Sequence, residues 1–260
     1  MARRLNGEKI LVTLDHLGEN VSSAGEAAAS RDSYLDSLRS IAGEKLDSTV
    51  SVKLTQLGLD LSPEICRENL ARLVETAAEI GSRVEIDMES SEYTDRTLTL
   101  VEEMHTRYRA VRAVLQAYLY RTEGDVKALN QLGVPIRLCK GAYHEPESVA
   151  FPRKEQVDDN YKHLLRLMFE AGTEPAVASH DPAMIEAALS LARLLQVDAS
   201  RFEFQMLYGI RRDLQDRLVA DGFRLRLYVP YGDAWYPYFM RRLAERPANV
   251  LFLARNVLRR

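Results

Sequence analysis

The chain has 260 residues, of which 46% are hydrophobic and 28% are charged, a composition typical of a globular protein with a sizeable core. Its formal net charge of −3 favours neither a nucleic-acid partner nor a strongly basic membrane-binding surface. Two isolated cysteines, Cys66 and Cys139, argue against a zinc site and indicate reduced thiols of an intracellular protein. The sequence shows neither an apolar run long enough to span a bilayer nor a secretory signal peptide.

Short apolar, β-branched segments alternate with segments of helical period along the whole chain. The second predicted helix has clear boundaries, because Ser62 is a favourable N-cap, Pro63 suits the first helical position and Gly81 follows the last turn. The predicted strands cover residues 9–17, 49–55, 83–90, 111–119, 134–143, 175–180, 201–207 and 223–230. The predicted helices cover residues 23–46, 62–80, 94–108, a short segment ending near Gly133, 161–170, 181–195, 211–220 and a last one from about Trp235.

Eight successive strand-then-helix units with no linker between them predict a single α/β domain over residues 1–260, a (β/α)₈ barrel of the TIM type. The alternative is an open, doubly wound sheet. Against that alternative, no Gly-x-Gly-x-x-Gly motif follows the first strand. An open sheet of eight parallel strands would also leave two long edges exposed.

In a (β/α)₈ barrel the active site lies at the carboxyl ends of the strands. Charged side chains are numerous there, and burying them is costly unless they are paired. Their convergence therefore predicts a functional site at the barrel mouth. The residues in question are Asp15, His16, Glu19, Lys53, Glu85, Asp87, Glu89, Gln116, Arg137, Lys140, Gly141, Ala142, Tyr143, Ser179, His180, Gln205 and Tyr228.

The segment "YGDAWYPYFMRRLAERP" places aromatic and cationic side chains on the last predicted helix. Tyr238, Arg241, Arg242 and Glu245 fall at helical spacing and form one stripe. A guanidinium binds a carboxylate bidentately, so the two arginines and Lys53 across the mouth predict a clamp for a carboxylate substrate.

Eight segments spread along almost the whole chain carry a further signal, and they are "VSVKLTQ", "EIDMES", "VLQAYL", "RLCKGAY", "ASHDP", "FEFQMLYG", "YVPYG" and "WYPYFMRRLAERPAN". Together they resemble the proline dehydrogenases, flavin-dependent barrels that oxidise proline. This resemblance runs in order along the chain. It implies noncovalently bound FAD and hydride transfer from the ring carbon beside the proline nitrogen to flavin N5. The product would be Δ1-pyrroline-5-carboxylate, in the first step of proline catabolism, and a quinone would reoxidise the flavin.

The resemblance also implies roles for individual substrate-site residues. Arg241, Arg242 and Lys53 would hold the substrate carboxylate. Asp87 would lie under the substrate, and Glu19 would form an ion pair with Arg241 that closes the site. The full implied substrate set is Glu19, Lys53, Asp87, Ala142, Tyr143, Leu207, Tyr228, Tyr238, Arg241 and Arg242.

For the flavin, the resemblance implies that Arg137 lies near N5 and that Gln116 contacts the ring edge. Glu245 would orient Arg242. Gly141 would let the cofactor lie against the backbone, since small residues permit close approach. The implied cofactor set is Gln116, Arg137, Cys139, Lys140, Gly141, Lys154, Ser179, His180, Gln205, Arg242 and Glu245, with no metal ligand.

The chain departs from the family pattern at its start, because it enters the first predicted strand almost at once. Members of the family usually carry helices before that strand, so either an N-terminal segment has been trimmed to give a minimal barrel or the family varies at this point. Asp181 also stands where some members carry Asn. The resemblance further implies a cytoplasmic enzyme with peripheral contact to the inner face of the plasma membrane, where a quinone is available.

Two other functions fit parts of the pattern. A Schiff-base aldolase needs a strand lysine, and Lys53 and Lys140 both qualify. A non-catalytic amino-acid-binding module would keep the carboxylate clamp without the flavin contacts. A yellow protein would favour the dehydrogenase, whereas a borohydride-trapped lysine adduct would favour the aldolase.

Overall fold

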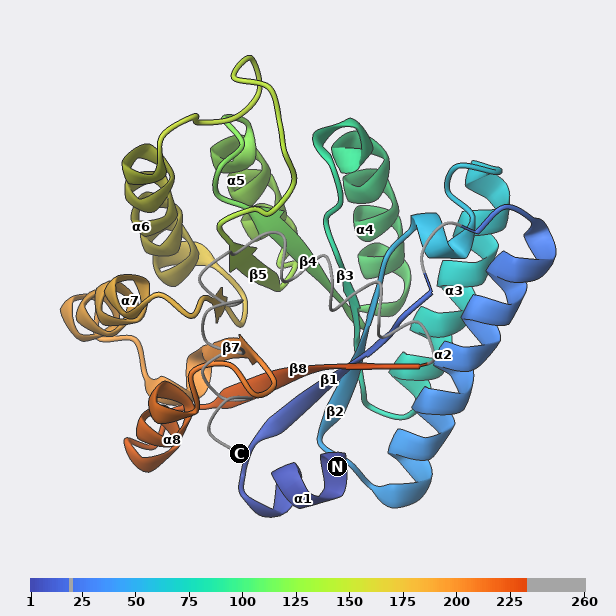
Figure 1. Cartoon of the computed structure of the whole chain (residues 1–260), viewed down its shortest axis with the longest axis horizontal. Coiled ribbons are helices and arrows are strands. Elements are labelled where there is room, and N and C mark those ends of the chain that lie inside the picture. Colours follow the sequence, from blue (N-terminus) through green and yellow to red (C-terminus); the bar gives the residue numbers. More distant parts are fainter. Residues whose placement is uncertain (19–20, 233–260) are drawn as a thin grey trace, which may run out of the picture.

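Eight parallel strands close into a barrel in the computed structural model, which describes residues 1–18 and 21–232 (Figure 1). The barrel closes between β1 (Leu11–His16) and β8 (Leu225–Tyr231), where Leu11 lies beside Arg226 and His16 beside Tyr231. An open sheet would leave these two strands as edges. The pairing therefore confirms the (β/α)₈ barrel and excludes the doubly wound alternative.

The strands follow one another around the barrel in sequence order. Between β1 and β8 they are β2 (Ser48–Val52), β3 (Val84–Ile86), β4 (Val111–Gln116), β5 (Ile136–Cys139), β6 (Ala176–Ala178) and β7 (Glu203–Leu207). The helices are α1 (Ala2–Gly7), α2 (Ala24–Glu44), α3 (Pro63–Glu79), α4 (Thr94–Tyr108), α5 (Thr122–Leu132), α6 (Lys154–Ala171), α7 (Pro182–Leu194) and α8 (Arg212–Ala220), with short 3₁₀ turns η1 (Thr55–Leu57), η2 (Ser91–Tyr93) and η3 (Ala199–Arg201).

All eight predicted strands are present, but most end earlier than predicted. β2 ends at Val52 and β3 at Ile86, so Lys53 and Asp87 lie just beyond the regular ladder. These residues therefore stand at the rim, where their side chains can reach the barrel mouth.

The predicted cap of α3 is confirmed, since the Ser62 hydroxyl accepts hydrogen bonds from the Glu64 and Ile65 N–H groups. Pro63 occupies the first turn, where its missing N–H costs nothing. The predicted last helix, from about Trp235, lies outside the described residues.

The predicted start of α6 at residue 161 is wrong, because the helix begins at Lys154. Its first two turns are polar and carry little of the apolar periodicity that identifies a helix from sequence. Local interactions fix the start instead. The Arg153 N–H donates to Gln156 Oε1 over 3.3 Å, and Lys154 pairs with Asp158 one turn later.

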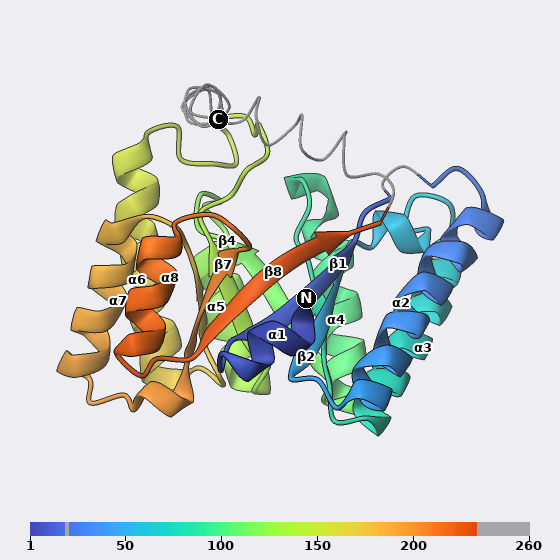
Figure 2. The ribbon, with the colours of Figure 1, turned by 60° about the horizontal axis from the view of Figure 1, so that its bottom comes forward.

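A short helix, α1, precedes the first strand and was not predicted. It lies beside the beginning of β1 (Figures 1 and 2). Leu5 packs into the core, and Asn6 donates to the Ile10 carbonyl over 2.9 Å and accepts from the Asp47 N–H over 2.9 Å. These bonds join α1 to the turn before β2.

The apolar core lies between the strands and the ring of helices (Figure 1). Val12, Val50 and Val84 are fully buried on the outward side of the strands, where helix residues such as Leu38 and Leu73 cover them. Each buried aliphatic side chain of this kind stabilises the fold by about 1.5–3 kcal/mol. The inward side of the strands differs, and it forms the candidate site.

Candidate active site

Polar side chains fill the inside of the barrel, where Val, Ile and Leu are usual. Side chains alternate between the two faces of a strand, so the residues between the outward-facing apolar ones point toward the barrel axis. The inward polar residues within the described residues are Thr13, Asp15, Thr49, Ser51, Glu85, Arg112, Gln116, Arg137, Glu203, Gln205, Arg226 and Tyr228.

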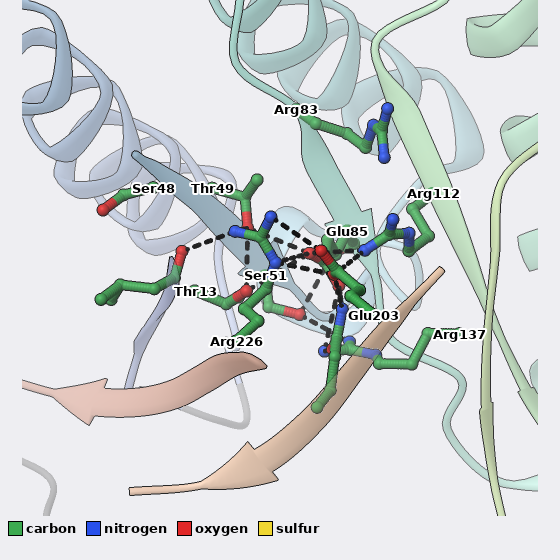
Figure 3. Close-up of polar contacts among 12 residues, drawn as sticks. Thr13, Ser48, Thr49, Ser51, Arg83, Glu85, Arg112, Arg137, Glu203 and Arg226 are labelled. Carbon is green, nitrogen blue, oxygen red and sulfur yellow. Dashed lines mark hydrogen bonds and ion pairs between the residues drawn. The ribbon is translucent and has the colours of Figure 1, made fainter. Parts of the chain in front are cut away.

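The deepest of these residues form an inner ion cluster of Glu85, Arg112, Glu203 and Arg226 (Figure 3). Arg226 Nε lies 2.8 Å from Glu203 Oε1, and Arg112 Nη1 lies 3.5 Å from Glu85 Oε1. Burial alone would raise the pKa of Glu85, but Arg137, Arg112 and Arg226 lower it to about 2. The cluster therefore stays ionised and cross-links β3, β4, β7 and β8 inside the barrel.

Asp87 is the centre of a second group, nearer the mouth. Its Oδ1 accepts hydrogen bonds from Arg137 and from the Ser51 hydroxyl, the latter over 2.8 Å. Its Oδ2 accepts from the Tyr228 hydroxyl over 2.8 Å. Arg137 also reaches down to Gln205 Oε1 at 3.1 Å and Glu85 Oε2 at 3.2 Å. The mouth group is thereby tied to the inner ion cluster.

Lys53 stands between two carboxylates at the rim. Its Nζ lies 3.9 Å from Asp15 Oδ1 and 3.9 Å from Asp87 Oδ2, and its side chain is 15% exposed. Burial raises the pKa of Asp15 to about 6, although the Lys53 charge opposes the shift. The structure thus brings together Lys53, Asp87, Arg137 and Tyr228.

A group of two lysines and two aspartates lies where β5 and β6 lead into α6 and α7. Lys140 Nζ contacts the carboxylates of Asp158 and Asp181, the latter at 2.7 Å, and Lys154 also contacts Asp158. Burial raises the pKa of Asp158, whereas the contacts with Lys140 and Lys154 lower it. The net result is a pKa below the usual value. Two predicted cofactor residues, Lys140 and Lys154, therefore share Asp158 as an ion-pair partner.

Ser179 and His180 follow β6 and link this group of lysines and aspartates to β7. The Ser179 hydroxyl accepts from the Asp181 N–H over 3.1 Å. His180 Nε2 accepts from the Leu207 N–H over 2.8 Å, which leaves the ring proton on Nδ1. Leu207, predicted at the substrate site, is thus held by the predicted flavin residue His180.

The backbone conformation and the packing of Tyr118 explain why position 141 is a glycine. Its φ of +112° strains any other residue, and an added Cβ would lie 2.3 Å from the Tyr118 ring. Tyr118 is buried, so the ring has little freedom to move away. Close packing of Tyr118 thus requires glycine here even without a cofactor.

The remaining predicted residues vary in exposure. Gln116 is 3% exposed, and its Oε1 accepts no hydrogen bond from the described residues. Cys139 is a free thiol whose pKa burial raises to about 11, so it stays protonated. Tyr143 is 41% exposed and, with Lys53 and Tyr93, lines a cavity of about 200 Å³ at the rim. Ala142 lies between Gly141 and Tyr143 on the segment after β5.

Five predicted residues fall outside the described part of the chain. They are Glu19, Tyr238, Arg241, Arg242 and Glu245. The carboxylate clamp is therefore represented here by Lys53, and the other clamp residues stay predictions.

The sequence does not predict four residues that form ion pairs inside the barrel or at its mouth, namely Arg112, Asp158, Glu203 and Arg226. For three of them a signal existed, since each lies on the inward face of a predicted strand, as Arg226 does two residues before Tyr228. Asp158 gave no such signal, because it lies on a turn of α6 that was predicted as a loop.

Within residues 1–18 and 21–232, no three His, Cys, Asp or Glu side chains are grouped so that they could hold a metal ion. None of the helices in these ranges combines the length and apolar character needed to cross a membrane.

The sequence matches the family model described as "Proline dehydrogenase" over residues 1–255. Proline dehydrogenase 2 of Bacillus subtilis (strain 168) is 45% identical over 250 residues, which are 96% of this chain and 82% of that protein. The proline dehydrogenase of Deinococcus radiodurans is 38% identical over 262 residues, covering 98% of this chain and 84% of that protein.

A solved structure is similar as well. The crystal structure of proline utilization A (PutA) from Bdellovibrio bacteriovorus, inactivated by N-propargylglycine, matches with a TM-score of 0.86 and 28% sequence identity. The match covers 93% of this chain but only 30% of the longer PutA chain.

Proposed function

The chain belongs to the proline dehydrogenase family, and we propose that it oxidises L-proline to Δ1-pyrroline-5-carboxylate at its barrel mouth, as the first step of proline catabolism. We further propose that residues 1–260 act as one catalytic domain with noncovalently bound FAD and a quinone as electron acceptor. The observation that carries the proposal is the convergence of Lys53, Asp87, Arg137 and Tyr228 at that mouth.

Lys53 is the described residue suited to bind the substrate carboxylate. Its ammonium is held at the rim by Asp15 and Asp87, so little side-chain freedom remains to be lost on binding. Arg241 and Arg242 would complete the clamp. Tyr228 would form a wall beside the proline ring, and its bond to Asp87 fixes the position of that wall.

The residues present fit a flavin. Gln116 Oε1 is a buried acceptor without a hydrogen-bond donor among the described residues, as expected if a ligand supplies one. Arg137 offers a positive charge at the mouth, and Lys140 and Lys154 offer charges for phosphate groups. When bound there, FAD supplies the acceptor for the hydride that leaves the proline ring.

The chain's own residues would position the substrate and exclude water. Loss of hydride leaves an iminium, so the substrate nitrogen has to be neutral beforehand. We therefore expect the rate to rise with pH as the bound amine loses its proton, and we assign no general base. Burial lowers the pKa of Arg137, but Asp87 and Glu85 raise it by more, so the guanidinium remains cationic.

A direct assay tests the function. We expect purified protein with FAD to convert L-proline to Δ1-pyrroline-5-carboxylate while reducing a soluble quinone mole for mole. Arg241→Met should raise the half-saturating proline concentration strongly while flavin stays bound. An unchanged proline affinity in that variant would contradict the clamp.

A Schiff-base aldolase would give a different result. Borohydride added with a carbonyl substrate would leave a covalent adduct on Lys53 or Lys140, and mass spectrometry would locate it. An amino-acid-binding module would bind proline without turnover.

The cellular context is part of the proposal. A quinone lies in the membrane, so we propose a cytoplasmic protein that contacts the inner face of the plasma membrane peripherally. Co-sedimentation with quinone-containing vesicles checks this, and we expect the protein in the vesicle fraction.

A further inference from the structure

Asp15 is a buried carboxylate that the proposed reaction does not yet use. It lies near the end of β1 with an exposed fraction of 0%. Neither of its oxygens accepts a hydrogen bond from the residues that the structure describes. Asp87, one strand further round from Lys53, instead accepts three, from Ser51, Arg137 and Tyr228.

This contrast matters because Lys53 lies 3.9 Å from both carboxylates. Three donors surround the carboxylate of Asp87. A buried carboxylate without donors is costly to ionise, so Asp15 is the member of the pair whose charge can change. Its pKa of about 6, raised mainly by burial, agrees with this geometry.

The charged and titratable groups that face Asp15 come from several elements. Lys53 follows β2, Asp87 follows β3 and Arg137 lies on β5, while the neighbouring His16 ring packs between two tyrosines. The titratable groups on the other sides of Asp15 are Tyr34 on α2, and Tyr228 and Tyr231 on β8. Burial raises the pKa of all three tyrosines, so they stay neutral. The nearby Tyr228 hydroxyl, which donates to Asp87, opposes the rise in the pKa of Asp15 only in part.

We propose that Asp15 is a positioning residue that holds the Lys53 ammonium and, through its own charge, sets how tightly Lys53 binds the substrate carboxylate. The proposal rests on the proposed function, because it assumes that Lys53 binds that carboxylate. When Asp15 is ionised, it attracts Lys53 and repels an arriving carboxylate. When Asp15 is protonated, this competition is removed, and the ammonium, which still lies 3.9 Å from Asp87, binds the substrate carboxylate more tightly.

A proton should therefore enter the site with the substrate. A bound carboxylate near Lys53 raises the pKa of Asp15 further, since like charges disfavour ionisation. Binding and protonation are linked, so the affinity for a carboxylate ligand should fall as pH rises through the pKa of Asp15.

The experiment uses the FAD-loaded full chain and tetrahydrofuran-2-carboxylate, a proline analogue whose ring oxygen replaces the amine. The analogue has no titrating nitrogen and is not oxidised, so only the protein titrates. We expect its Kd, measured by calorimetry, to be about three- to tenfold higher at about pH 8 than at about pH 5. Asp15→Asn should abolish this pH dependence.

Glu89→Gln is the matched control. Glu89 is also a buried carboxylate with a raised pKa near Lys53, but Thr55 donates two hydrogen bonds to it. We expect Glu89→Gln to keep the pH dependence of Kd. A dependence that survives in Asp15→Asn, or that vanishes only in Glu89→Gln, overturns the proposal.

A measurement on the unmodified protein covers the case of a variant that does not fold. Calorimetry near pH 6.5 in two buffers of different ionisation enthalpy should show net proton uptake on analogue binding, of about half a proton. Binding without proton uptake overturns the role of Asp15 and leaves the proposed function intact. Absence of analogue and proline binding in all proteins would count against the proposed function itself.

Discussion

At the residue scale, charged side chains inside the barrel fall into two kinds. In the inner ion cluster each carboxylate lies beside a guanidinium, and although burial raises the pKa of Glu203, Arg112 and Arg226 hold it well below the usual value. Asp15 has only Lys53 at 3.9 Å and no hydrogen-bond donor within the described residues. The ion pairs of the inner cluster support the fold. A buried carboxylate with few partners, such as Asp15, lowers stability and is retained where the chemistry of the site needs it.

Asp15→Asn should stabilise the protein at neutral pH. The folded-state pKa of Asp15, about 6, exceeds the unfolded value of 3.8, so the folded state holds the extra proton between these values. Stability of the unmodified protein therefore falls as pH rises through that window. The variant should gain roughly 2–3 kcal/mol at about pH 7 and almost nothing near pH 4.

Urea unfolding of both proteins across this pH range measures the difference. A gain that is equal at all pH values would mean that ionisation of Asp15 is not its cause. A loss at neutral pH would mean that Asp15 stabilises the fold.

Glu203→Gln should have the opposite effect. Glu203 is 1% exposed and pairs with Arg112 and Arg226, so its loss leaves buried guanidinium charge uncompensated. The free energy of unfolding should fall by about 3–5 kcal/mol. Glu186→Gln, which breaks an exposed pair with Arg217, is the control and should cost less than about 1 kcal/mol. Equal losses in the two variants would contradict the structural role of the inner ion cluster.

At the element scale, the strands and most helices could be predicted because each carries one apolar stripe. The Ser62–Pro63 start of α3 was also readable, because cap chemistry is local. The start of α6 could not be read from apolar periodicity, since its first turns are polar and held by local contacts. The charged partners inside the barrel are not predicted from the sequence, because the fold directs attention to the carboxyl ends of the strands, whereas Arg112 and Glu203 lie at the starts of their strands.

The segment after β5 should tolerate no side chain at Gly141. Gly141→Ala forces a positive φ on alanine and drives its Cβ into the Tyr118 ring. Strain alone costs about 1–3 kcal/mol, and displacement of the segment should weaken flavin binding because Lys140 precedes it directly. Gly124→Ala in α5, where nothing lies within 4 Å, is the control and should stabilise the helix slightly.

Thermal unfolding and flavin titration of both variants test this. A Gly141→Ala protein with normal stability and flavin affinity would show that the Tyr118 contact does not fix this segment.

At the scale of the whole molecule, strand order places the mouth residues together. Lys53, Asp87, Arg137 and Tyr228 come from four different strand units and meet only because β8 pairs with β1. The fold and the convergence of these four residues at the mouth followed from the sequence. Glu19 and the Tyr238–Glu245 stripe lie outside the described residues, so their part in the site stays a prediction.

The most direct test of the account is the visible spectrum of the purified protein, recorded without oxygen before and after addition of L-proline. The account predicts a flavin spectrum that bleaches with L-proline but not with L-alanine. That result would identify cofactor, substrate and reaction in one experiment. A colourless protein that FAD does not reconstitute, or a flavin spectrum that L-proline leaves unchanged, would contradict the proposal that this barrel is a flavin-dependent proline dehydrogenase.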